Sequence, residues 1–330
     1  MKRPHKLSEI AAACGVSTAT VSRALKRPEL VRKETRAAVM LAAEKAGYGK
    51  GGLTVDRITL GTIGLVVPDI ENPFFSVLAK AVLQELRPSG TSLIVADTNE
   101  EPLGEGEIVN NLLPRVDGVI IASSRLAESD LSELVTSKPV MLINRELNGV
   151  PSVVTDYDIG SRQAVEHLVA LGHRKIAYVE GPATTWSNGQ RRSGFQNEMT
   201  EHGLEPIVFG PYAPRFEGGV PAADIAVARG VTAVIAYNDL MAFGIMSRLI
   251  SRGLNVPDRI SVIGFDDIPA ASICSPPLTT VRTWIAATGR LAAQSLSRII
   301  AGRGSSTVTN QRLLSQLVVR ASTGMVPGHE

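Results

Sequence analysis

The chain has 330 residues, of which 44% are hydrophobic and 20% charged, and its formal net charge is +2. This composition is typical of a globular protein with a sizeable core, and it argues against a disordered or fibrous chain. There is no run of about 18 apolar residues and no leader-like N-terminus, so we expect no membrane span, no secretion and a cytoplasmic location.

The charge is distributed unevenly along the chain. The first 50 residues carry 11 Lys and Arg against 4 Glu, a net +7, whereas the remainder carries 23 basic and 28 acidic residues, a net −5. A small positive segment on a negative body indicates that the segment contacts a polyanion such as DNA. The alternative is a basic terminus that only faces water.

Residues 5–48 predict a compact, all-α domain of three short helices. The first covers 7–14, the second covers 18–25 with Ser17 as its cap, and the third begins near 33–36 and ends before Gly47. We expect these helices to form a separate head.

Ala11, Gly15 and Val21 have the spacing of a helix-turn-helix. The first position must be small because the two helices cross there, and the second lies in a tight turn where glycine tolerates a positive φ. The third packs under the first helix. The start of the second helix is then free to enter a major groove of DNA.

The second helix supplies most of the predicted DNA contacts. Thr18, Ala19 and Arg23 are expected at base edges, since arginine binds guanine bidentately and a methyl group contacts that of thymine. Helix capping or exposure to water is the alternative role for Thr20 and Ser22. The other predicted DNA contacts, mainly to phosphates, are Ser17, Thr20, Ser22, Lys26, Thr35 and Arg36.

Residues 49–60 predict a linker. Three of its first four residues are glycine, a composition typical of flexible connections.

From residue 61 onward, buried apolar runs alternate with helical patterns. Such alternation predicts parallel, doubly wound sheets, and the pattern restarts near Gly160, which indicates two lobes. The expected strands are 62–67, 92–96, 118–122, 139–143, 153–154, 175–179, 207–209, 233–236 and 260–264. The expected helices are 74–86, 105–113, 160–171, 189–202, 221–229 and 239–252.

Residues 7–25, with Glu34-Thr35-Arg36 and Gly47-Tyr48, resemble the DNA-binding head of the lac repressor/galactose repressor family. The resemblance continues through the body, which is also similar to periplasmic sugar-binding proteins. The matching phrases are residues 69–75, 143–145, 172–177, Arg191-x-x-Gly194-Phe195, 238–239 and 277–281.

This resemblance implies a homodimer, or a tetramer built from it, on a near-palindromic operator, with a small effector between the lobes. The family's linker usually forms a hinge helix whose leucine wedges into the minor groove. Here the family's Pro-Asn is absent and glycines occupy the helix start, so a normal hinge is in doubt; Leu53 or Val55 is the candidate wedge.

The resemblance also implies the ligand contacts. Phe74 and Phe75 would stack on a ring or belong to the core, and Arg145 would bind ligand or brace the lobes. A further aromatic is expected from Tyr212 or Phe216, and the pair Asp266-Asp267 is expected to serve turn structure instead. The predicted ligand-binding residues are Asp69, Phe74, Phe75, Asn144, Arg145, Trp186, Ser187, Arg191, Phe216 and Asp239.

We therefore predict an all-α head and an α/β body of two doubly wound lobes. The expected domains are a DNA-binding domain at 1–48, a linker at 49–60 and an effector-binding and dimerisation domain at 61–330. Within the last, the first lobe takes about 61–158 and 288–318, and the second about 159–287 and 319–330.

The predicted function is a sequence-specific transcription regulator, a repressor, modulated by a sugar, polyol or nucleoside. An enzyme is the first alternative, but phosphate loops, nucleophile elbows and metal-spaced histidines are missing, so we expect no catalysis, no cofactor and no metal. A transport-type binding protein is the second alternative, against which the head argues.

Overall fold

The chain forms two compact units, Met1–Ile58 and Thr59–Glu330, which we describe separately. The predicted linker 49–60, with Leu53 and Val55, lies outside the described residues. The computed structural model describes residues 5–26, 31–32, 35–36, 38–39, 42, 61–135, 138–302 and 310–326.

The smaller unit contains helices α1 (His5–Cys14) and α2 (Thr18–Lys26), and residues 35, 36, 38, 39 and 42 are also helical. Gly15 joins α1 to α2 with φ +62°, the left-handed conformation that glycine adopts most easily. The core of this unit consists of Ile10, Ala11, Val21, Ala24 and Val39. Since Ala11 and Val21 are buried together next to the Gly15 turn, the predicted helix-turn-helix is confirmed.

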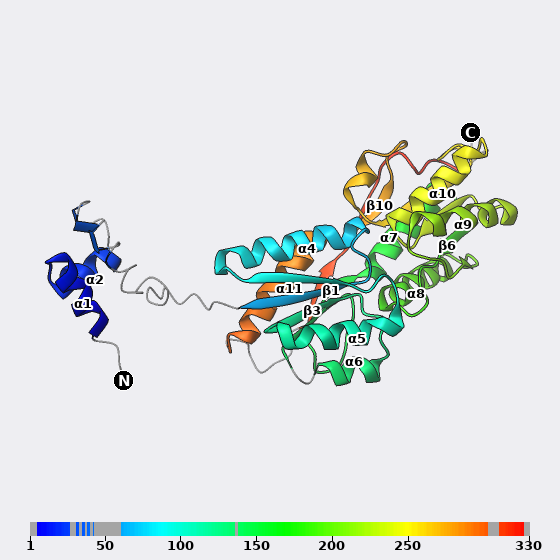
Figure 1. Ribbon diagram of the computed structural model, residues 1–330. Coiled ribbons are helices and arrows are strands. Elements are labelled where there is room, and N and C mark those ends of the chain that lie inside the picture. The colour runs from blue at the N-terminus through cyan, green and yellow to red at the C-terminus, as the bar shows by residue number, and fades with distance from the viewer. Residues whose placement is uncertain are drawn as a thin grey trace. The chain divides into compact units, whose positions relative to one another are not determined.

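The first lobe of the larger unit is built on a six-stranded parallel sheet in the order β11-β5-β4-β3-β1-β2. Its strands are β1 (Thr62–Val67), β2 (Ser92–Asp97), β3 (Gly118–Ala122), β4 (Val140–Ile143), β5 (Ser152–Asp156) and β11 (Asn310–Leu314). Its helices are α4 (Pro73–Leu86), α5 (Pro102–Leu112), α6 (Glu128–Leu134) and α11 (Ile285–Ile300). Helix α11 packs against α4 on one face, and α5 and α6 cover the other, as Figure 1 shows.

The second lobe has the corresponding sheet order, β12-β10-β9-β8-β6-β7, and all of its pairs are parallel except β10 with β12. Its strands are β6 (Ile176–Val179), β7 (Ile207–Phe209), β8 (Ala233–Ala236), β9 (Ser261–Asp266), β10 (Thr279–Arg282) and β12 (Gln316–Val318). Its helices are α7 (Tyr157–Ala170), α8 (Trp186–Glu201), α9 (Phe216–Arg229) and α10 (Asp239–Ser251).

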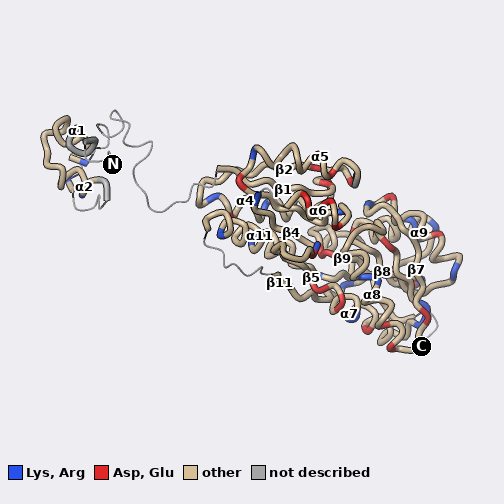
Figure 2. The backbone as a smooth tube through the Cα atoms, turned by 90° about the horizontal axis from the view of Figure 1, so that it is seen from below, with Lys and Arg blue, Asp and Glu red and all other residues tan. Residues whose placement is uncertain are grey.

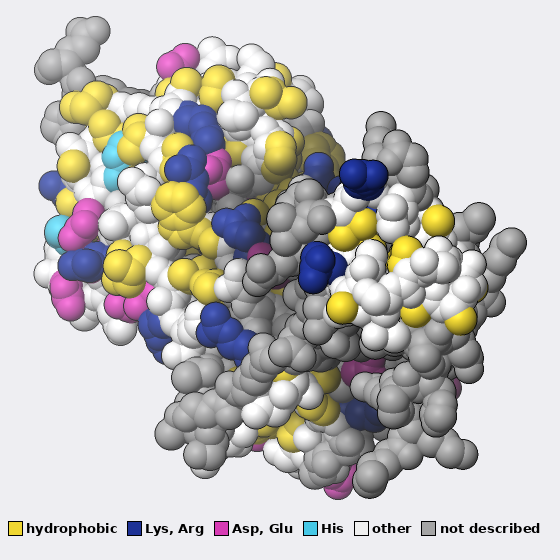
Figure 3. Space-filling model, turned by 90° about the vertical axis from the view of Figure 1, so that its left-hand side faces the viewer, with side chains coloured by type: hydrophobic (Ala, Val, Ile, Leu, Met, Phe, Trp, Pro, Cys, Tyr) yellow, Lys and Arg dark blue, Asp and Glu magenta, His cyan; other side chains and the backbone are white. Residues whose placement is uncertain are grey.

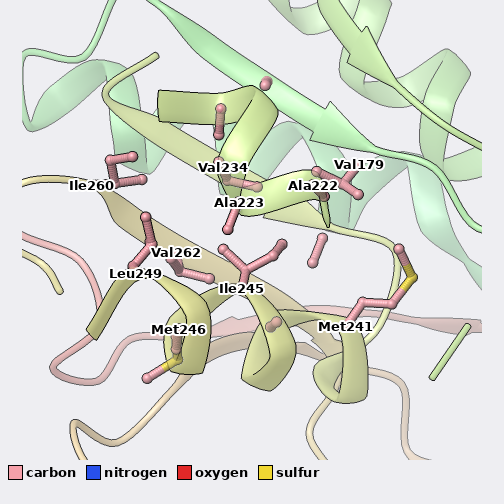
Figure 4. Packing of buried hydrophobic residues seen from close by; sticks show 14 of the residues in the cluster. Val179, Ala222, Ala223, Val234, Met241, Ile245, Met246, Leu249, Ile260 and Val262 are labelled. Atoms are coloured by element: carbon pink, nitrogen blue, oxygen red, sulfur yellow. The ribbon is translucent and has the colours of Figure 1, made fainter. Parts of the chain in front are cut away.

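The sheet of the second lobe is buried on both faces, as its continuous apolar strands require. Helices α9 and α10 pack over one face, where small alanines of α9 meet the long side chains Met241 and Ile245 of α10 (Figure 4). Tyr178, Phe195 and Phe265 belong to the core on the other face, beneath α7 and α8. The predicted fold class, a helical head with two doubly wound lobes, is confirmed.

The chain crosses between the lobes at three points in the larger unit: between β5 and α7, between β10 and α11, and between β11 and β12. The predicted lobe boundaries differ slightly from these crossings. Gln316–Val318 was expected in the first lobe, but it pairs with β10 in the second sheet. Helix α6 was not predicted, because its seven residues are too few to give a clear helical period, and the elements after β9, which are β10, α11, β11 and β12, were not predicted individually.

Charged residues of both signs are scattered over the two lobes, as Figure 2 shows. On the face of the larger unit that is visible in Figure 3, basic, acidic and hydrophobic side chains are interspersed.

Candidate functional site

In the smaller unit, the N-terminal part of α2 presents short polar side chains and one arginine. Thr18, Ala19 and Arg23 are exposed, so the predicted base contacts are accessible. The Ser17 hydroxyl accepts a hydrogen bond from the Thr20 backbone N–H at 3.1 Å and bonds the Thr20 hydroxyl at 2.9 Å. Ser17 thus caps α2, which fixes the helix start that a major groove would receive.

The remaining predicted DNA contacts are less fully described. Ser22 and Thr35 are half-buried and Arg36 is exposed. Lys26 ends α2, and its side chain lies outside the described residues, as does Leu53.

A pocket with an empty volume of about 390 Å³ lies between the two lobes of the larger unit. From the first lobe it is lined by Pro68, Asn72, Phe74, Phe75, Glu100, Ser123, Arg125 and Asn144. From the second it is lined by Tyr157, Thr185, Ser187, Arg191, Pro214, Tyr237, Asn238 and Asp266. These residues follow the carboxyl ends of strands or begin the next helix, where open α/β sheets bind their ligands.

Three helix N-termini reach the pocket through their caps. The side chains of Asn72, Thr185 and Asn238 accept hydrogen bonds from backbone N–H groups of α4, α8 and α10. Asn238 also donates to the Pro214 carbonyl at 2.8 Å. The positive ends of these helix dipoles therefore face the pocket, where they favour electronegative ligand atoms.

Arg191 is the central charge of the second lobe's wall. Its Nη2 lies 3.0 Å from Asp266 Oδ1 and its Nη1 donates to the Tyr237 carbonyl, while the guanidinium carbon lies 4.4–4.6 Å from the ring centres of Tyr157, Tyr237 and Phe265. Burial alone would lower the pKa of Arg191, but Asp266 and the tyrosines raise it. The side chain is thus a permanently charged, rigidly held hydrogen-bond donor.

Arg125 holds the equivalent place in the first lobe. Its guanidinium forms an ion pair with the Glu100 carboxylate and donates to the Glu100 carbonyl at 3.1 Å. Its backbone N–H donates to Glu105 Oε2 at 2.9 Å. Burial raises the pKa of Glu105 despite hydrogen bonds from Ser124 and Arg125. Each lobe thus contributes one arginine–carboxylate pair to the pocket.

Four lining residues have a left-handed backbone: Glu100, Ser123, Asn144 and Asp266, with φ between 52° and 109°. Each follows or ends a strand of its lobe's sheet. Non-glycine residues in this region cost on the order of 1 kcal/mol each, and such strain concentrates at binding sites. The strain turns side chains that would otherwise continue the strand toward the pocket.

Several lining side chains have a buried polar atom without a hydrogen-bond partner among the described residues. These atoms are Arg125 Nε, Asn144 Oδ1, Tyr157 OH and Arg191 Nε, together with Glu100 Oε2, which has no hydrogen bond but forms the ion pair with Arg125. Burial raises the pKa of Tyr157 to about 12, so its hydroxyl stays protonated and can donate or accept. An unpaired buried polar group is costly, which makes these atoms natural ligand contacts.

One ion pair joins the lobes beside the pocket. Arg215 Nε, at the start of α9, lies 3.0 Å from Asp69 Oδ2 at the end of β1. Arg215 also donates to Asn99 Oδ1 at 3.3 Å. Because Asp69 and Asn99 belong to the first lobe, Arg215 connects the two walls directly.

Each of the two units matches a known protein family. The family of bacterial regulatory proteins named lacI matches residues 6–50, and the periplasmic binding protein-like domain matches residues 165–323. The regulator reg1 of Streptomyces lividans is 32% identical over 98% of both chains. The regulator GalS of Salmonella typhimurium is 34% identical over 92% of both chains.

The chain belongs to the lacI family. It is a DNA-binding transcriptional regulator, as are these relatives, none of which is named as an enzyme.

Solved structures of transcriptional regulators share the fold over 80–98% of this chain. The lac repressor dimer bound to operator and the anti-inducer ONPF gives a TM-score of 0.76 at 28% identity, covering 98% of this chain and 100% of that one. The CelR–cellobiose complex gives 0.71 at 28% identity, covering 97% and 100%. A lacI-family regulator from Enterococcus faecium with bound ribose gives 0.73 at 28% identity, covering 80% and 98%.

Of the ligand contacts predicted for this lacI-family regulator, the structure brings five to the pocket. These are Phe74, Phe75, Asn144, Ser187 and Arg191. The two phenylalanine rings are buried and meet edge to face at 5.0 Å, so they belong to the core and to the pocket wall at once. The Ser187 hydroxyl bonds the Tyr237 hydroxyl at 3.0 Å.

Five predicted contacts do not line the pocket. Asp69 pairs with Arg215, and Arg145 braces the first lobe by donating to the Leu126 carbonyl at 3.3 Å. Trp186 packs on the second lobe's core against Tyr157, which takes the wall position expected for the tryptophan. Phe216 is 40% exposed, and its loop contributes Pro214 instead.

Asp239 is the fifth of these residues. Its carboxylate accepts from the Thr280 hydroxyl at 2.5 Å and from the Ile268 N–H at 2.8 Å, beneath the pocket wall. Asp266, which was expected to serve turn structure, lines the pocket instead and pairs with Arg191. Asp267 is structural as predicted for the pair, because it binds Arg282 and Arg320.

Five further residues line the pocket but were not predicted from the sequence: Glu100, Arg125, Tyr157, Tyr237 and Asn238. Arg125 lies three residues beyond β3, and Tyr237 and Asn238 directly follow β8. Their places after strand ends could have identified them, since the carboxyl ends of parallel strands meet at one edge. Glu100 lies on a longer loop, which gives no such signal.

Within the described residues, no cluster of three or more His, Cys, Asp or Glu side chains could hold a metal ion. The helices described are all too short or too polar to cross a membrane.

Proposed function

We propose that this lacI-family regulator is a repressor whose affinity for operator DNA is changed by a small polyhydroxylated molecule bound between the lobes. The observation that carries the proposal is the set of four buried polar atoms, on Arg125, Asn144, Tyr157 and Arg191, that converge on the pocket without partners among the described residues. A hydroxyl group donates and accepts, so one class of ligand satisfies all four.

Aromatic side chains give the pocket the apolar surface that a polyhydroxylated ring also needs. Phe74, Phe75, Tyr157 and Tyr237 offer apolar surface to the carbon–hydrogen faces of a ring. The ribose and cellobiose bound to the two similar structures above support this class, and a polyol or nucleoside shares its hydroxyl pattern.

The DNA-contacting part is the exposed N-terminal half of α2. Thr18, Ala19 and Arg23 would contact base edges, while Ser17, Thr20, Ser22, Lys26, Thr35 and Arg36 would set the helix on the phosphates. Replacing Arg23 by alanine should weaken binding to the preferred site by about 1–3 kcal/mol and relax its sequence preference.

The effect of Arg23 can be measured on DNA sites selected from a random library by the full-length protein. Arg32→Ala removes the same charge from another exposed head residue and serves as the control. Equal, sequence-independent weakening in both variants would contradict base contact by Arg23 and assign it to the phosphates.

We infer a homodimer, on which a tetramer could be built, that uses the outer edge of the first lobe. Strand β2 is an edge strand, and Ile94 and Val95 on it are 37% and 41% exposed; Leu83 on neighbouring α4 is 50% exposed. Apolar side chains on a free edge strand favour association with a second copy. Leu83→Asp should shift the sedimenting species to monomer and weaken operator binding.

The coupling between ligand and DNA is tested with intact protein and its selected DNA site. Binding is followed by fluorescence anisotropy with and without a panel of neutral sugars, polyols and nucleosides. One ligand should change the dissociation constant for DNA at least fivefold, the usual scale of such coupling. A ligand that binds tightly yet leaves DNA affinity unchanged at every salt concentration would overturn the proposal.

We further infer that the body senses its ligand without converting it, and that the protein works in the cytoplasm, beside the DNA it binds. Support comes from relatives that are named as regulators. Recovery of a changed ligand after incubation with the protein would overturn the first inference.

A further inference from the structure

The pocket contains one buried ion pair from each lobe. Arg125 and Glu100 come from loops after β3 and β2, and their side chains are 8% and 14% exposed. Arg191 and Asp266 come from α8 and the end of β9, with exposures of 3% and 7%. At these burials the charges are weakly screened by water and salt.

The charges that line the pocket cancel. Two arginines face two carboxylates, and Tyr157 remains a neutral phenol, because burial raises its pKa to about 12. A ligand with its own charge would therefore enter a confined space that offers no spare counter-charge, and burying an uncompensated charge is strongly unfavourable.

The two pairs differ in how firmly the arginine is held. Arg191 is fixed by Asp266, by the Tyr237 carbonyl and by three aromatic rings. In the part of the chain that the structure describes, the Arg125 guanidinium has hydrogen bonds and an ion pair only with Glu100. Glu100 is thus the one carboxylate that pairs with Arg125 directly, while Asp69 and Arg215 act on its charge from a distance with opposite signs.

Other charges near Arg125 already have partners. Asp69 is paired with Arg215 across the lobes, and Glu105 receives the Arg125 backbone N–H and lies near the positive charge of Arg145. If the Glu100 carboxylate were removed, Arg125 would be left as the unmatched cation in the pocket wall.

We propose that Glu100 is a specificity-determining residue: by neutralising Arg125 inside the pocket, it makes the regulator select an uncharged polyol over the corresponding sugar acid. This inference rests on the proposed function, since it concerns the ligand of the same pocket. A sugar carboxylate that approaches Arg125 meets the Glu100 carboxylate first and is repelled, whereas a hydroxyl bridges the two by accepting from Arg125 Nε and donating to Glu100.

The test compares sugars with their own acids. The full-length protein is titrated calorimetrically with D-glucose and D-glucuronate, D-galactose and D-galacturonate, and D-ribose and D-ribonate. Wild type should bind at least one neutral member at least 100-fold more tightly than its acid. Glu100→Gln keeps the size of the side chain but removes its charge, and should narrow this ratio at least tenfold.

Two further variants provide a control and a second, independent test of the charge pair. Glu71→Gln removes an exposed carboxylate from the loop that carries Asn72 and should leave the ratio unchanged. Arg125→Gln leaves Glu100 as the unmatched anion and should increase the preference for the neutral sugar over its acid. This variant therefore tests the role of the Glu100 charge even if Glu100→Gln folds poorly.

The outcomes separate this inference from the function on which it rests. If a neutral sugar binds and neither Glu100→Gln nor Arg125→Gln alters its affinity relative to that of its acid, the role of Glu100 is overturned and the proposed function remains intact. A wild-type preference for an acid would also overturn it. A failure to bind any compound of this panel or of the wider neutral panel would overturn both.

Discussion

The two lobes have the same architecture, with six strands in the same spatial order, yet they present their polar groups to the pocket differently. In the second lobe, Arg191 and Asn238 are held by several protein partners each. In the first lobe, Arg125 is held by one residue and the Asn144 side-chain oxygen has no partner among those described.

The two lobes, although similar in architecture, therefore contribute differently to ligand recognition. The second lobe is preorganised, so it loses little conformational entropy when a ligand binds. Both lobes leave buried polar atoms for the ligand, but in the first lobe the Arg125 guanidinium is held by Glu100 alone, so the ligand supplies a larger share of its contacts. Substitutions in the second lobe should therefore affect both stability and binding, and those in the first lobe should affect mainly binding.

The largest effect is expected from Arg191→Met. It leaves Asp266 buried without its counter-charge, so the free energy of unfolding should fall by about 3–5 kcal/mol and ligand binding should be lost. Denaturant titration measures the free energy of unfolding, and calorimetry measures ligand binding. Arg192→Met, on the same helix but 48% exposed, is the control and should cost less than about 1 kcal/mol. Equal free energies of unfolding for Arg191→Met and Arg192→Met would contradict the view that the second lobe is preorganised around Arg191.

Asn144→Gly should separate binding from stability. Glycine adopts the φ of +52° without strain, so unfolding should change by less than about 1 kcal/mol. Loss of the amide should nevertheless weaken ligand binding about tenfold, the usual scale of one buried hydrogen bond. Asn99→Gly, with φ +50° outside the pocket lining, is the control. Large destabilisation by Asn144→Gly would show that the first lobe is as tightly built as the second.

Asp239→Asn should alter how stability depends on pH. Burial, with repulsion from Asp266, raises the pKa of Asp239 well above its usual value, so the folded chain holds this proton more tightly than the unfolded chain. The resulting stabilisation is present at low pH and is lost as pH rises from about 4 through the raised pKa. Melting temperatures measured from pH 4 to 8 should fall less for the variant than for wild type, and a steeper fall would contradict the assignment.

The smallest effect is expected from Asp69→Asn, which weakens the ion pair between the lobes. Because Arg215 is 39% exposed, the pair should contribute less than about 1 kcal/mol, and ligand affinity should change less than fivefold. The change should shrink at high salt, because exposed charges are screened. A salt-independent loss of binding would indicate that Asp69 contacts the ligand, as the sequence predicted.

The order of strands and helices up to β9, apart from α6, could be predicted from sequence because both sheets are covered on two faces. Their strands are continuous apolar runs, and several following helices begin with recognisable caps such as Asn72 and Asn238. The last crossing was predicted near residues 318–319, three residues beyond its place between β11 and β12. Strands β11 and β12 are separated by a single residue, so composition does not distinguish their sheets.

The site was predictable only in part, and the reason is backbone conformation. Asp239 begins α10 three residues beyond β8 and Asp266 ends β9, and by residue type either suits an arginine partner. The φ of 109° at Asp266 lets its side chain meet Arg191, whereas Asp239 is directed toward Thr280. Contacts from outside a motif, such as Glu100 with Arg125, depend on the path of a loop that sequence pattern does not specify.

The three crossings between the lobes have a consequence for synthesis on the ribosome. The first sheet receives its sixth strand, β11, from residues 310–314, and α4 receives its neighbour α11 from residues 285–300. A nascent chain that has been translated as far as β10 therefore carries a first lobe with one strand missing and the apolar side of α4 uncovered. The lobe that is made first can be completed only after nearly all of the second has left the exit tunnel, so a ribosome that stalls between these points holds a chain that needs a chaperone.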